Sequence, residues 1–152
     1  DHSVAAMLAL PDAEILAHGI AMSPGKPTIL ARAGQKAVIG LPGQVTSAQV
    51  VMAVLVKPLL KHLAGDSSAL AQAEQAAPLL VAELARNIAG RPGREDFVRV
   101  RLEARAGQPP LAHPVLGKSG LLKTLLAADG LIAVPARAEG LYQGALCPVW
   151  AL

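Results

Sequence analysis

The spacing of hydrophobic residues divides the chain into two halves that predict different structures. In the first half, short runs rich in Ile, Leu, Val and Ala are separated by Gly and Pro, which is typical of strands joined by turns. These runs are residues 14–20, 28–32 and 37–41. Gly34 and Gln35 supply a turn between the last two runs, so we expect them to form a hairpin. A short helix is expected before them, over residues 3–10.

A longer apolar segment, residues 46–63, predicts the main helix of the chain. Thr46 or Ser47 is suited to cap its first turn. Because the middle of the segment is apolar on every side, we expect it to be buried between layers or in a subunit interface. Pro58 should kink the helix, since it removes one backbone donor and crowds the carbonyl of Val54.

The second half predicts strands instead. Residues 96–105 alternate between apolar and charged side chains, which indicates a half-buried strand. Gly and Pro separate further strand-like runs at residues 80–88, 111–116, 131–134 and 145–151. A small all-β barrel or sandwich is the fold that this spacing favours, interrupted by a helical turn over residues 120–128.

Between the halves, residues 66–78 are small, polar and rich in Ala, which predicts a linker or a frayed helix. The expected domains are therefore residues 1–65 and residues 79–152. Residues 1–65 hold too few strands and helices to cover a sheet on both faces. We therefore expect a homodimer that buries residues 50–56, or a companion chain.

Composition narrows the possible functions. Aromatic residues make up only 2% of the chain, so the core must be aliphatic, and the base-stacking platform of a single-stranded nucleic-acid binder is missing. The net charge of +3 is spread along the chain, which leaves no nucleic-acid footprint but suits a small anionic ligand. With Cys147 as the only cysteine, neither an internal disulfide nor a cysteine zinc cluster can form.

The sequence also predicts a location. The start shows no signal-peptide pattern, and the longest apolar run, residues 50–56, falls short of the roughly 20 residues that a membrane span needs. We therefore expect a cytoplasmic protein without a membrane partner. A start other than Met suggests either a fragment of a longer protein or processing of the N-terminus.

Two Gly/Pro clusters bracket the predicted hairpin and indicate a binding site. They are Pro24, Gly25, Lys26 and Pro27 before it, and Gly40, Leu41, Pro42 and Gly43 after it. The chain direction brings both clusters to one edge of the sheet, where the main helix also begins with its unpaired N–H groups. Lys26 adds a full positive charge, so the pattern predicts a site for an oxyanion or a phosphate. The alternative is that Gly and Pro mark ordinary turns around a solvated lysine.

At these residues the sequence resembles the molybdopterin molybdotransferase family, which includes MoeA and the gephyrin E domain. The resemblance rests on HGIAMSPGKPT, on GLPG with the apolar helix and proline that follow, on RPGREDFVRVRL and on GKSGLLKTLLAADGLIAVP. It covers almost the whole chain and corresponds to the C-terminal part of such a protein. It implies an α/β fragment, the end of a three-layer αβα molybdopterin-binding domain, followed by a small all-β barrel domain.

The resemblance also implies a reaction in molybdenum cofactor biosynthesis. Family members insert molybdate into adenylylated molybdopterin and release AMP, assisted by Mg²⁺. Lys26 would be the catalytic residue that holds the anion, and both Gly/Pro clusters would shape the pterin-phosphate pocket. Ser119 could approach the ligand across a dimer, or belong to a plain turn. Asp1 would be the metal-linked carboxylate of the family's acidic motif, or simply a frayed terminal residue.

Some residues depart from the family's pattern. Ser23 stands where many members have a basic residue, and Gln44 and Val45 stand where they have Asn-Pro. One positive charge and one rigid bend are therefore missing, so weaker molybdate binding, a different oxyanion or a specialised paralogue could follow. The sequence does not distinguish molybdate from tungstate. The same fold could also serve as a non-catalytic module that binds pterin or only dimerises, since gephyrin has a scaffold role.

Other motifs point less clearly to chemistry. Residues 112–119 (AHPVLGKS) nearly match a phosphate-binding P-loop but have Ala112 where glycine is required. The four histidines lack the spacing of metal ligands, although His18 precedes the PGKP cluster and could support a site there. A basic face of Arg99, Arg101 and Arg105 either faces an anion or carries the charges that protect an exposed strand.

Overall fold

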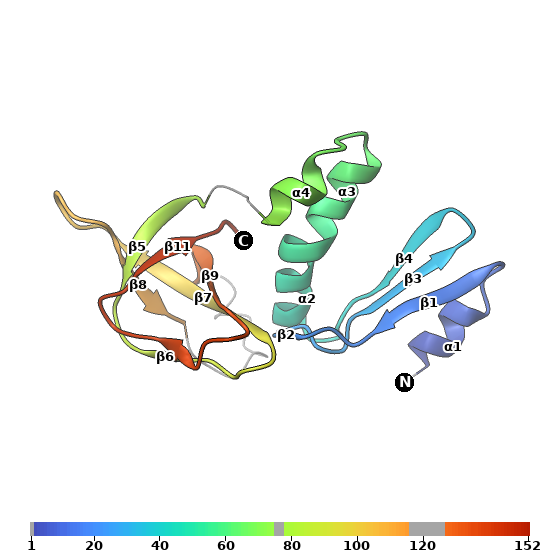
Figure 1. The fold of residues 1–152 in the computed structure, drawn as a ribbon, viewed down its shortest axis with the longest axis horizontal. Helices are drawn as coiled ribbons and strands as arrows, with labels where there is room; N and C mark the ends of the chain where they lie inside the picture. Colours follow the sequence, from blue (N-terminus) through green and yellow to red (C-terminus); the bar gives the residue numbers. More distant parts are fainter. Residues whose placement is uncertain (1, 75–77, 116–126) are drawn as a thin grey trace.

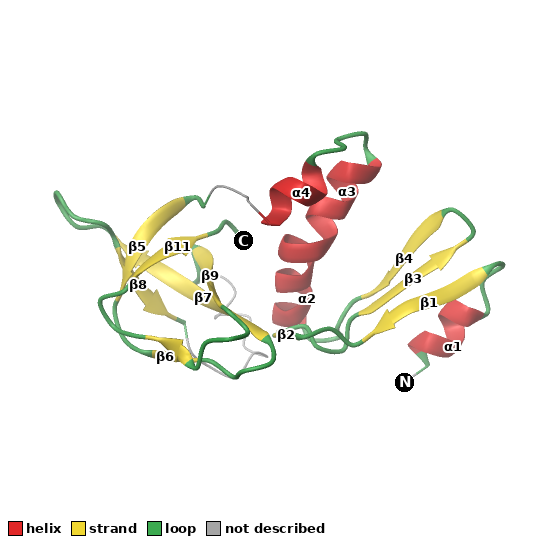
Figure 2. Ribbon diagram, viewed as in Figure 1, coloured by secondary structure: helices red, strands yellow, loops and turns green. Residues whose placement is uncertain are grey.

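The computed structural model describes residues 2–74, 78–115 and 127–152. A small sheet with one helix lies at one side of the molecule, a larger sheet lies at the other, and a long helix stands between them (Figure 1). Figure 2, which is coloured by secondary structure, shows that the second half of the described chain consists of strands and loops. None of the helices that the structure describes is long and apolar enough to cross a membrane.

The first region has a simple order of elements. It contains α1 (Ser3–Leu8), β1 (Ala13–His18), β2 (Met22–Ser23), β3 (Ile29–Ala33), β4 (Lys36–Gly40), α2 (Val45–Val51), the π-helical segment η1 (Met52–Val56), α3 (Lys57–Leu63) and α4 (Ala69–Glu74). β1, β3 and β4 form an antiparallel sheet in the order β1-β3-β4. The predicted hairpin is confirmed, because β3 and β4 pair along their whole length around Gly34, whose φ of 57° suits a tight turn.

The strand expected over residues 14–20 is shorter than predicted. β1 ends at His18, and Gly19 then adopts a φ of 87°, which turns the chain out of the small sheet. Met22 and Ser23 form β2, which pairs in parallel with β7 of the larger sheet. The loop after β1 therefore connects the two sheets, a feature that local hydrophobicity did not reveal.

The main helix runs from Val45 to Leu63 as α2, η1 and α3. Its predicted caps are wrong: Gln44 is the N-cap, and Thr46 and Ser47 lie buried in the first turn. In η1 the N–H of Lys57 donates to the carbonyl of Met52, five residues back. This π-helical turn comes just before Pro58, which cannot donate a backbone hydrogen bond, so the helix adapts one turn upstream of the proline.

Burial of the main helix differs from the expectation of a subunit interface. Val50 and Val51 are fully buried, and Val56 is nearly so, within the chain itself. They pack with Met22 of β2 and Leu131 of the larger sheet. Val50, Val51 and Val56 are therefore covered within the chain, whereas Met52 in the same stretch stays exposed, and the expected homodimer stays a prediction.

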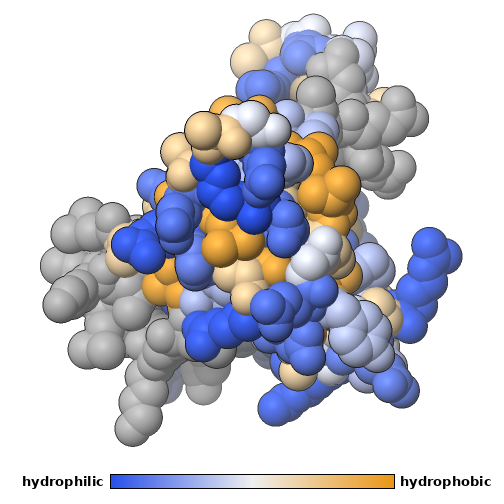
Figure 3. Space-filling view, turned by 90° about the vertical axis from the view of Figure 1, so that its left-hand side faces the viewer, coloured by the Kyte–Doolittle hydropathy of each residue, from blue (hydrophilic) through white to orange (hydrophobic). Residues whose placement is uncertain are grey.

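The second region is a mixed sheet. Its strands are β5 (Leu80–Leu84), β6 (Ile88–Ala89), β7 (Glu95–Glu103), β8 (Leu111–Pro114), β9 (Gly130–Val134), β10 (Gly140–Leu141) and β11 (Leu146–Val149). The six-stranded sheet has the order β11-β5-β8-β7-β2, with β9 paired to β7, and β6 and β10 pair separately. Its core is aliphatic, as the composition requires, and includes Leu84, Val100, Ile132 and Val149. Figure 3 views the molecule from the side of the larger sheet. It shows hydrophobic residues gathered in the middle of this face and hydrophilic residues around them.

The expected barrel is not confirmed by the described residues. No continuous ladder closes the sheet, and its two ends are linked by a single bridge between Leu131 and Trp150. α4 occupies residues 69–74 of the predicted linker, in agreement with the alternative of a helix there. The helical turn expected over residues 120–128 falls largely outside the described residues.

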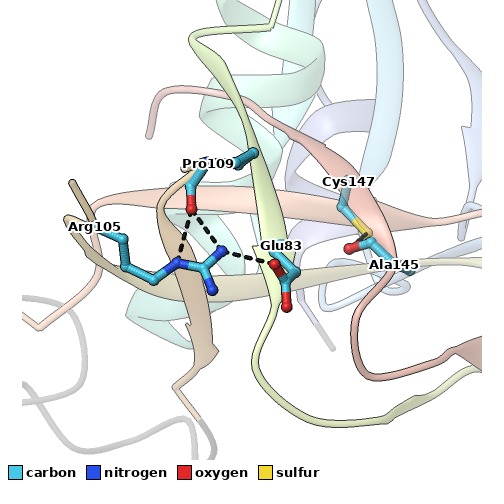
Figure 4. Close-up of polar contacts among 5 residues, drawn as sticks. All are labelled: Glu83, Arg105, Pro109, Ala145 and Cys147. Atoms are coloured by element: carbon cyan, nitrogen blue, oxygen red, sulfur yellow. Dashed lines mark hydrogen bonds and ion pairs between the residues drawn. The ribbon is translucent and has the colours of Figure 1, made fainter. Parts of the chain in front are cut away.

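The predicted basic face of β7 is also different in the structure. Arg99 is only 8% exposed, although the alternation placed it outward, and its burial lowers the pKa of its guanidinium. Arg105 lies beyond the end of β7 and is bound to Glu83 and to the carbonyl of Pro109 (Figure 4). Only Arg101 is exposed as expected, so the three arginines do not form one continuous anion-facing surface.

Candidate functional site

Strand register brings the two Gly/Pro clusters to the same edge of the small sheet. His18 at the end of β1 pairs with Ile29 at the start of β3, and Ile29 in turn pairs with Gly40 at the end of β4. The loop of residues 19–28 and the segment of residues 41–44 therefore both leave the sheet at this edge. The main helix begins there as well, with Gln44 as its N-cap.

The loop that carries Lys26 is held in shape by its own hydrogen bonds. The N–H of Ile20 donates to the carbonyl of Lys26, and the N–H of Gly19 donates to that of Thr28. Thr28 is fully buried, and its hydroxyl donates to the carbonyl of Gly25 over 2.7 Å. The backbone of Lys26 is fixed by these contacts while its side chain stays exposed.

Pairing of β2 with β7 places this loop beside a second basic turn. Met22 lies opposite Glu95 and Ser23 opposite Asp96, and the N–H of Glu95 donates to the carbonyl of Ala21. Arg94 immediately precedes β7 and therefore lies next to the Lys26 loop. Two segments that are distant in the sequence thus meet at one point.

A cavity of about 440 Å³ lies between these two segments, and we call it the Lys26 pocket. It is lined by His18, Gly19, Ile20, Ala21, Met22, Lys26, Pro92, Gly93 and Arg94. A second cavity of about 350 Å³ adjoins it through Arg94 and is lined by Ser23, Pro24, Ala89, Gly90, Arg91, Arg94, Asp96, Phe97 and Val98.

The charges around the Lys26 pocket are mainly positive. The Lys26 ammonium has no hydrogen bond or ion pair with any residue that the structure describes. Arg94 forms an ion pair with the buried carboxylate of Asp96 at 3.0 Å, and the N–H of Arg91 donates to the same carboxylate. The Nε atom of Arg94 is buried and lacks a hydrogen-bond partner among the described residues. Such a donor is costly to leave unpaired, and Arg94 is one of the residues that line the pocket.

The predicted site residues do not all lie at these cavities. Lys26 lines the first and Pro24 the second, whereas Gly40, Leu41, Pro42 and Gly43 line neither, although they lie at the same sheet edge. Pro27 is exposed beside Lys26. Asp1 and Ser119 lie outside the described residues.

The glycines of the two clusters have different reasons to be glycine. A Cβ atom on Gly25 would lie 2.8 Å from Cγ2 of Val51, so this glycine allows the loop to pack on the main helix. A Cβ atom on Gly40 would lie 2.8 Å from the terminal methyl of Met7 in α1. A Cβ atom on Gly43 would have no heavy atom within 4 Å, and the φ of Gly43 is one that any residue can adopt. Its backbone is therefore open on the side where a side chain would project.

Comparison with known proteins matches each region to a family model. Residues 1–62 match the family model described as a probable molybdopterin binding domain, and residues 81–152 match that of the MoeA C-terminal region, domain IV. The chain belongs to the MoeA family.

Individual members of the MoeA family give the extent of the match. Molybdopterin molybdenumtransferase 2 of Mycobacterium tuberculosis is 28% identical over 138 residues, which cover 88% of this chain and 31% of the relative. The crystal structure of a molybdopterin biosynthesis MoeA protein from Pyrococcus horikosii is 33% identical with a TM-score of 0.77, covering 98% of this chain and 34% of that one. A molybdenum cofactor biosynthesis protein from Pyrococcus furiosus shares the fold at 24% identity, with a TM-score of 0.63 and coverage of 90% and 45%. The chain spans about a third of the length of the curated relatives that it matches.

Arg94 of the candidate site was not among the residues predicted from the sequence. Arg94 was taken as part of a resemblance motif and not as a site residue, because its partner segment lies in the other half of the chain. A signal was present, since RPGRE repeats the pattern of a Gly/Pro turn with a basic residue just before a strand. That signal shows a basic turn but not which loop it meets.

The described residues contain no cluster of metal-ligating side chains. No group of three or more His, Cys, Asp or Glu side chains among them is arranged to hold a metal ion. Asp96 is the buried carboxylate nearest to the pocket, and it is already satisfied by Arg94 and by the backbone N–H of Arg91.

Proposed function

We propose that this chain acts in molybdenum cofactor biosynthesis, as the C-terminal part of a molybdopterin molybdotransferase. In that reaction molybdate is inserted into adenylylated molybdopterin and AMP is released. The family membership and the name of the Mycobacterium tuberculosis relative support this proposal. Because the chain spans about a third of such relatives, the proposal concerns its share of the substrate site and not turnover by this chain alone.

The observation that carries the proposal is the pair of unpaired cationic donors at the Lys26 pocket. The ammonium of Lys26 and the buried Nε–H of Arg94 both lack partners among the described residues, and both residues line the same cavity. A tetrahedral oxyanion or a phosphate supplies the acceptors that these donors need. Lys26 would neutralise and position the anion, which is electrostatic stabilisation and requires no nucleophile.

The segment from Gly40 to Gly43 would contribute to the same substrate site from the side. It shares the sheet edge with the Lys26 loop and leads directly into the main helix. The open backbone at Gly43 suits close approach of a larger ligand, such as the pterin with its phosphate. In this proposal the oxyanion occupies the Lys26 pocket and the pterin extends towards Gly43.

Titration calorimetry with molybdate and with AMP tests this assignment on the 152-residue chain. Lys26→Ala should weaken molybdate binding about tenfold or more, because one charge-assisted contact contributes roughly 1.5–3 kcal/mol. Lys36→Ala is the matched control, since Lys36 is an exposed lysine at the opposite end of β4. Equal binding by the parent and Lys26→Ala, or binding by neither, would overturn the site assignment.

We also propose that the chain self-associates, through exposed apolar residues of the main helix and not through the buried Val50, Val51 and Val56. Val45, Met52 and Leu60 are 62%, 39% and 55% exposed, although each is apolar. They are spaced seven and eight residues apart, close to two helical turns, so they follow one side of the helix. Such a stripe of apolar side chains favours an isologous contact with a second copy.

A further inference from the structure

His18 is a second unpaired group at the Lys26 pocket that the proposed function does not use. It is the last residue of β1, its side chain is exposed, and it lines the cavity together with Lys26 and Arg94. Its ring makes no hydrogen bond or ion pair with the residues that the structure describes.

The charged groups around His18 do not neutralise a positive charge on its ring. Lys26 faces the pocket from the loop that follows β1, and Arg94 faces it from the turn before β7. The carboxylate of Asp96 is held by Arg94, and on β1 itself the carboxylate of Glu14 is held by Arg32 at 2.7 Å. Glu95 follows Arg94 in the chain but does not line the pocket. No carboxylate that lines the pocket is therefore present to neutralise a charged His18.

We propose that His18 is a further anion-binding residue of the Lys26 pocket, and that its imidazolium form strengthens the binding of a doubly charged tetrahedral anion. This inference rests on the proposed function, because it assumes that Lys26 holds the anion. The imidazolium donates from both ring nitrogens and adds a positive charge, whereas the neutral ring offers one donor and no charge. The pocket thus prefers dianions such as molybdate or sulfate, and holds them more tightly when the His18 ring is charged.

Sulfate is the suitable probe for the pH dependence, because it stays a dianion throughout the range in which histidine titrates. Calorimetric titration of the parent chain with sulfate should show about tenfold tighter binding at about pH 5.5 than at about pH 8. His18→Gln keeps a hydrogen-bonding side chain and should lose most of this difference. His62→Gln is the matched control, since His62 is an exposed histidine on α3, and it should behave as the parent does.

A second measurement reads the ring directly. Sulfate should raise the pKa of His18 in an NMR titration of its ring protons and leave that of His62 unchanged, because a bound anion favours the charged imidazole. An unchanged pH dependence in His18→Gln, or an unmoved His18 titration in the presence of bound sulfate, would overturn the inference.

The outcomes separate this inference from the proposed function. If Lys26→Ala loses binding at both pH values while His18→Gln keeps the parent's pH dependence, the inference fails and the function stands. If Lys26→Ala binds molybdate as the parent does, the proposed function fails. Absence of sulfate and molybdate binding in every variant overturns both.

Discussion

At the scale of single residues, Gly25 shows how closely the Lys26 loop packs on the main helix. A side chain there would meet Val51 at 2.8 Å and Met22 at 3.0 Å, at a φ of 128°. Gly25→Ala should therefore destabilise the fold by about 1–3 kcal/mol, the usual cost of overpacking, as measured by urea denaturation. Gly107→Ala is the control, because Gly107 has a φ of 68° but open space around it. An equal loss in both variants would show that backbone strain, and not packing, requires the glycine.

At the scale of elements, Arg105 ties the loop between β7 and β8 to strand β5. Its guanidinium donates to the carbonyl of Pro109 at 2.6 and 2.9 Å and to the carboxylate of Glu83 at 2.7 Å (Figure 4). This contact supports the parallel pairing of β5 with β8, which has only two register pairs, Glu83 with Leu111 and Leu84 with Ala112.

Replacement of Arg105 should therefore cost more than replacement of a neighbouring arginine. Arg105→Ala should lower the free energy of unfolding by about 1–2 kcal/mol, and Arg105→Lys should recover little of it because the contacts need a forked donor. Arg101→Ala, on the exposed side of β7, should stay within about 0.5 kcal/mol of the parent. Chemical denaturation of the three variants measures this, and full recovery by lysine would contradict the forked geometry.

At the scale of the whole molecule, the exposed side of the main helix predicts a dimer. Analytical ultracentrifugation should show the parent chain as a dimer and the double variant Met52→Glu with Leu60→Glu as a monomer, because charges in an apolar contact are desolvated without a partner. Leu146→Glu is the control, since Leu146 is 62% exposed on β11. A parent chain that sediments as a monomer would contradict the proposed self-association, and loss of the dimer only in Leu146→Glu would move the contact to the larger sheet.

Much of the candidate site could be predicted at the level of individual segments. The PGKP and GLPG clusters, the hairpin between them and the helix after them follow from the order of Gly, Pro and aliphatic residues. Whether Lys26 binds an anion stays a prediction. The place of Arg94 beside Lys26 could not be predicted, because it depends on the two-residue strand β2 pairing with β7. Such pairing uses backbone groups that do not depend on the side chains. The side chains of β2 therefore do not indicate which strand it pairs with.

The sequence by itself determined the two regions, the aliphatic core and the sheet edge that carries Lys26, because hydrophobic period and turn residues act locally. Only the tertiary structure decided which surfaces are covered. Val50 and Val51 look like interface residues in the sequence, but the second sheet buries them. Arg99 looks exposed by alternation, but it is buried, and β2 leaves its own sheet for another. Burial depends on which distant segments meet, and the free energy of those contacts belongs to the whole chain and not to any one segment.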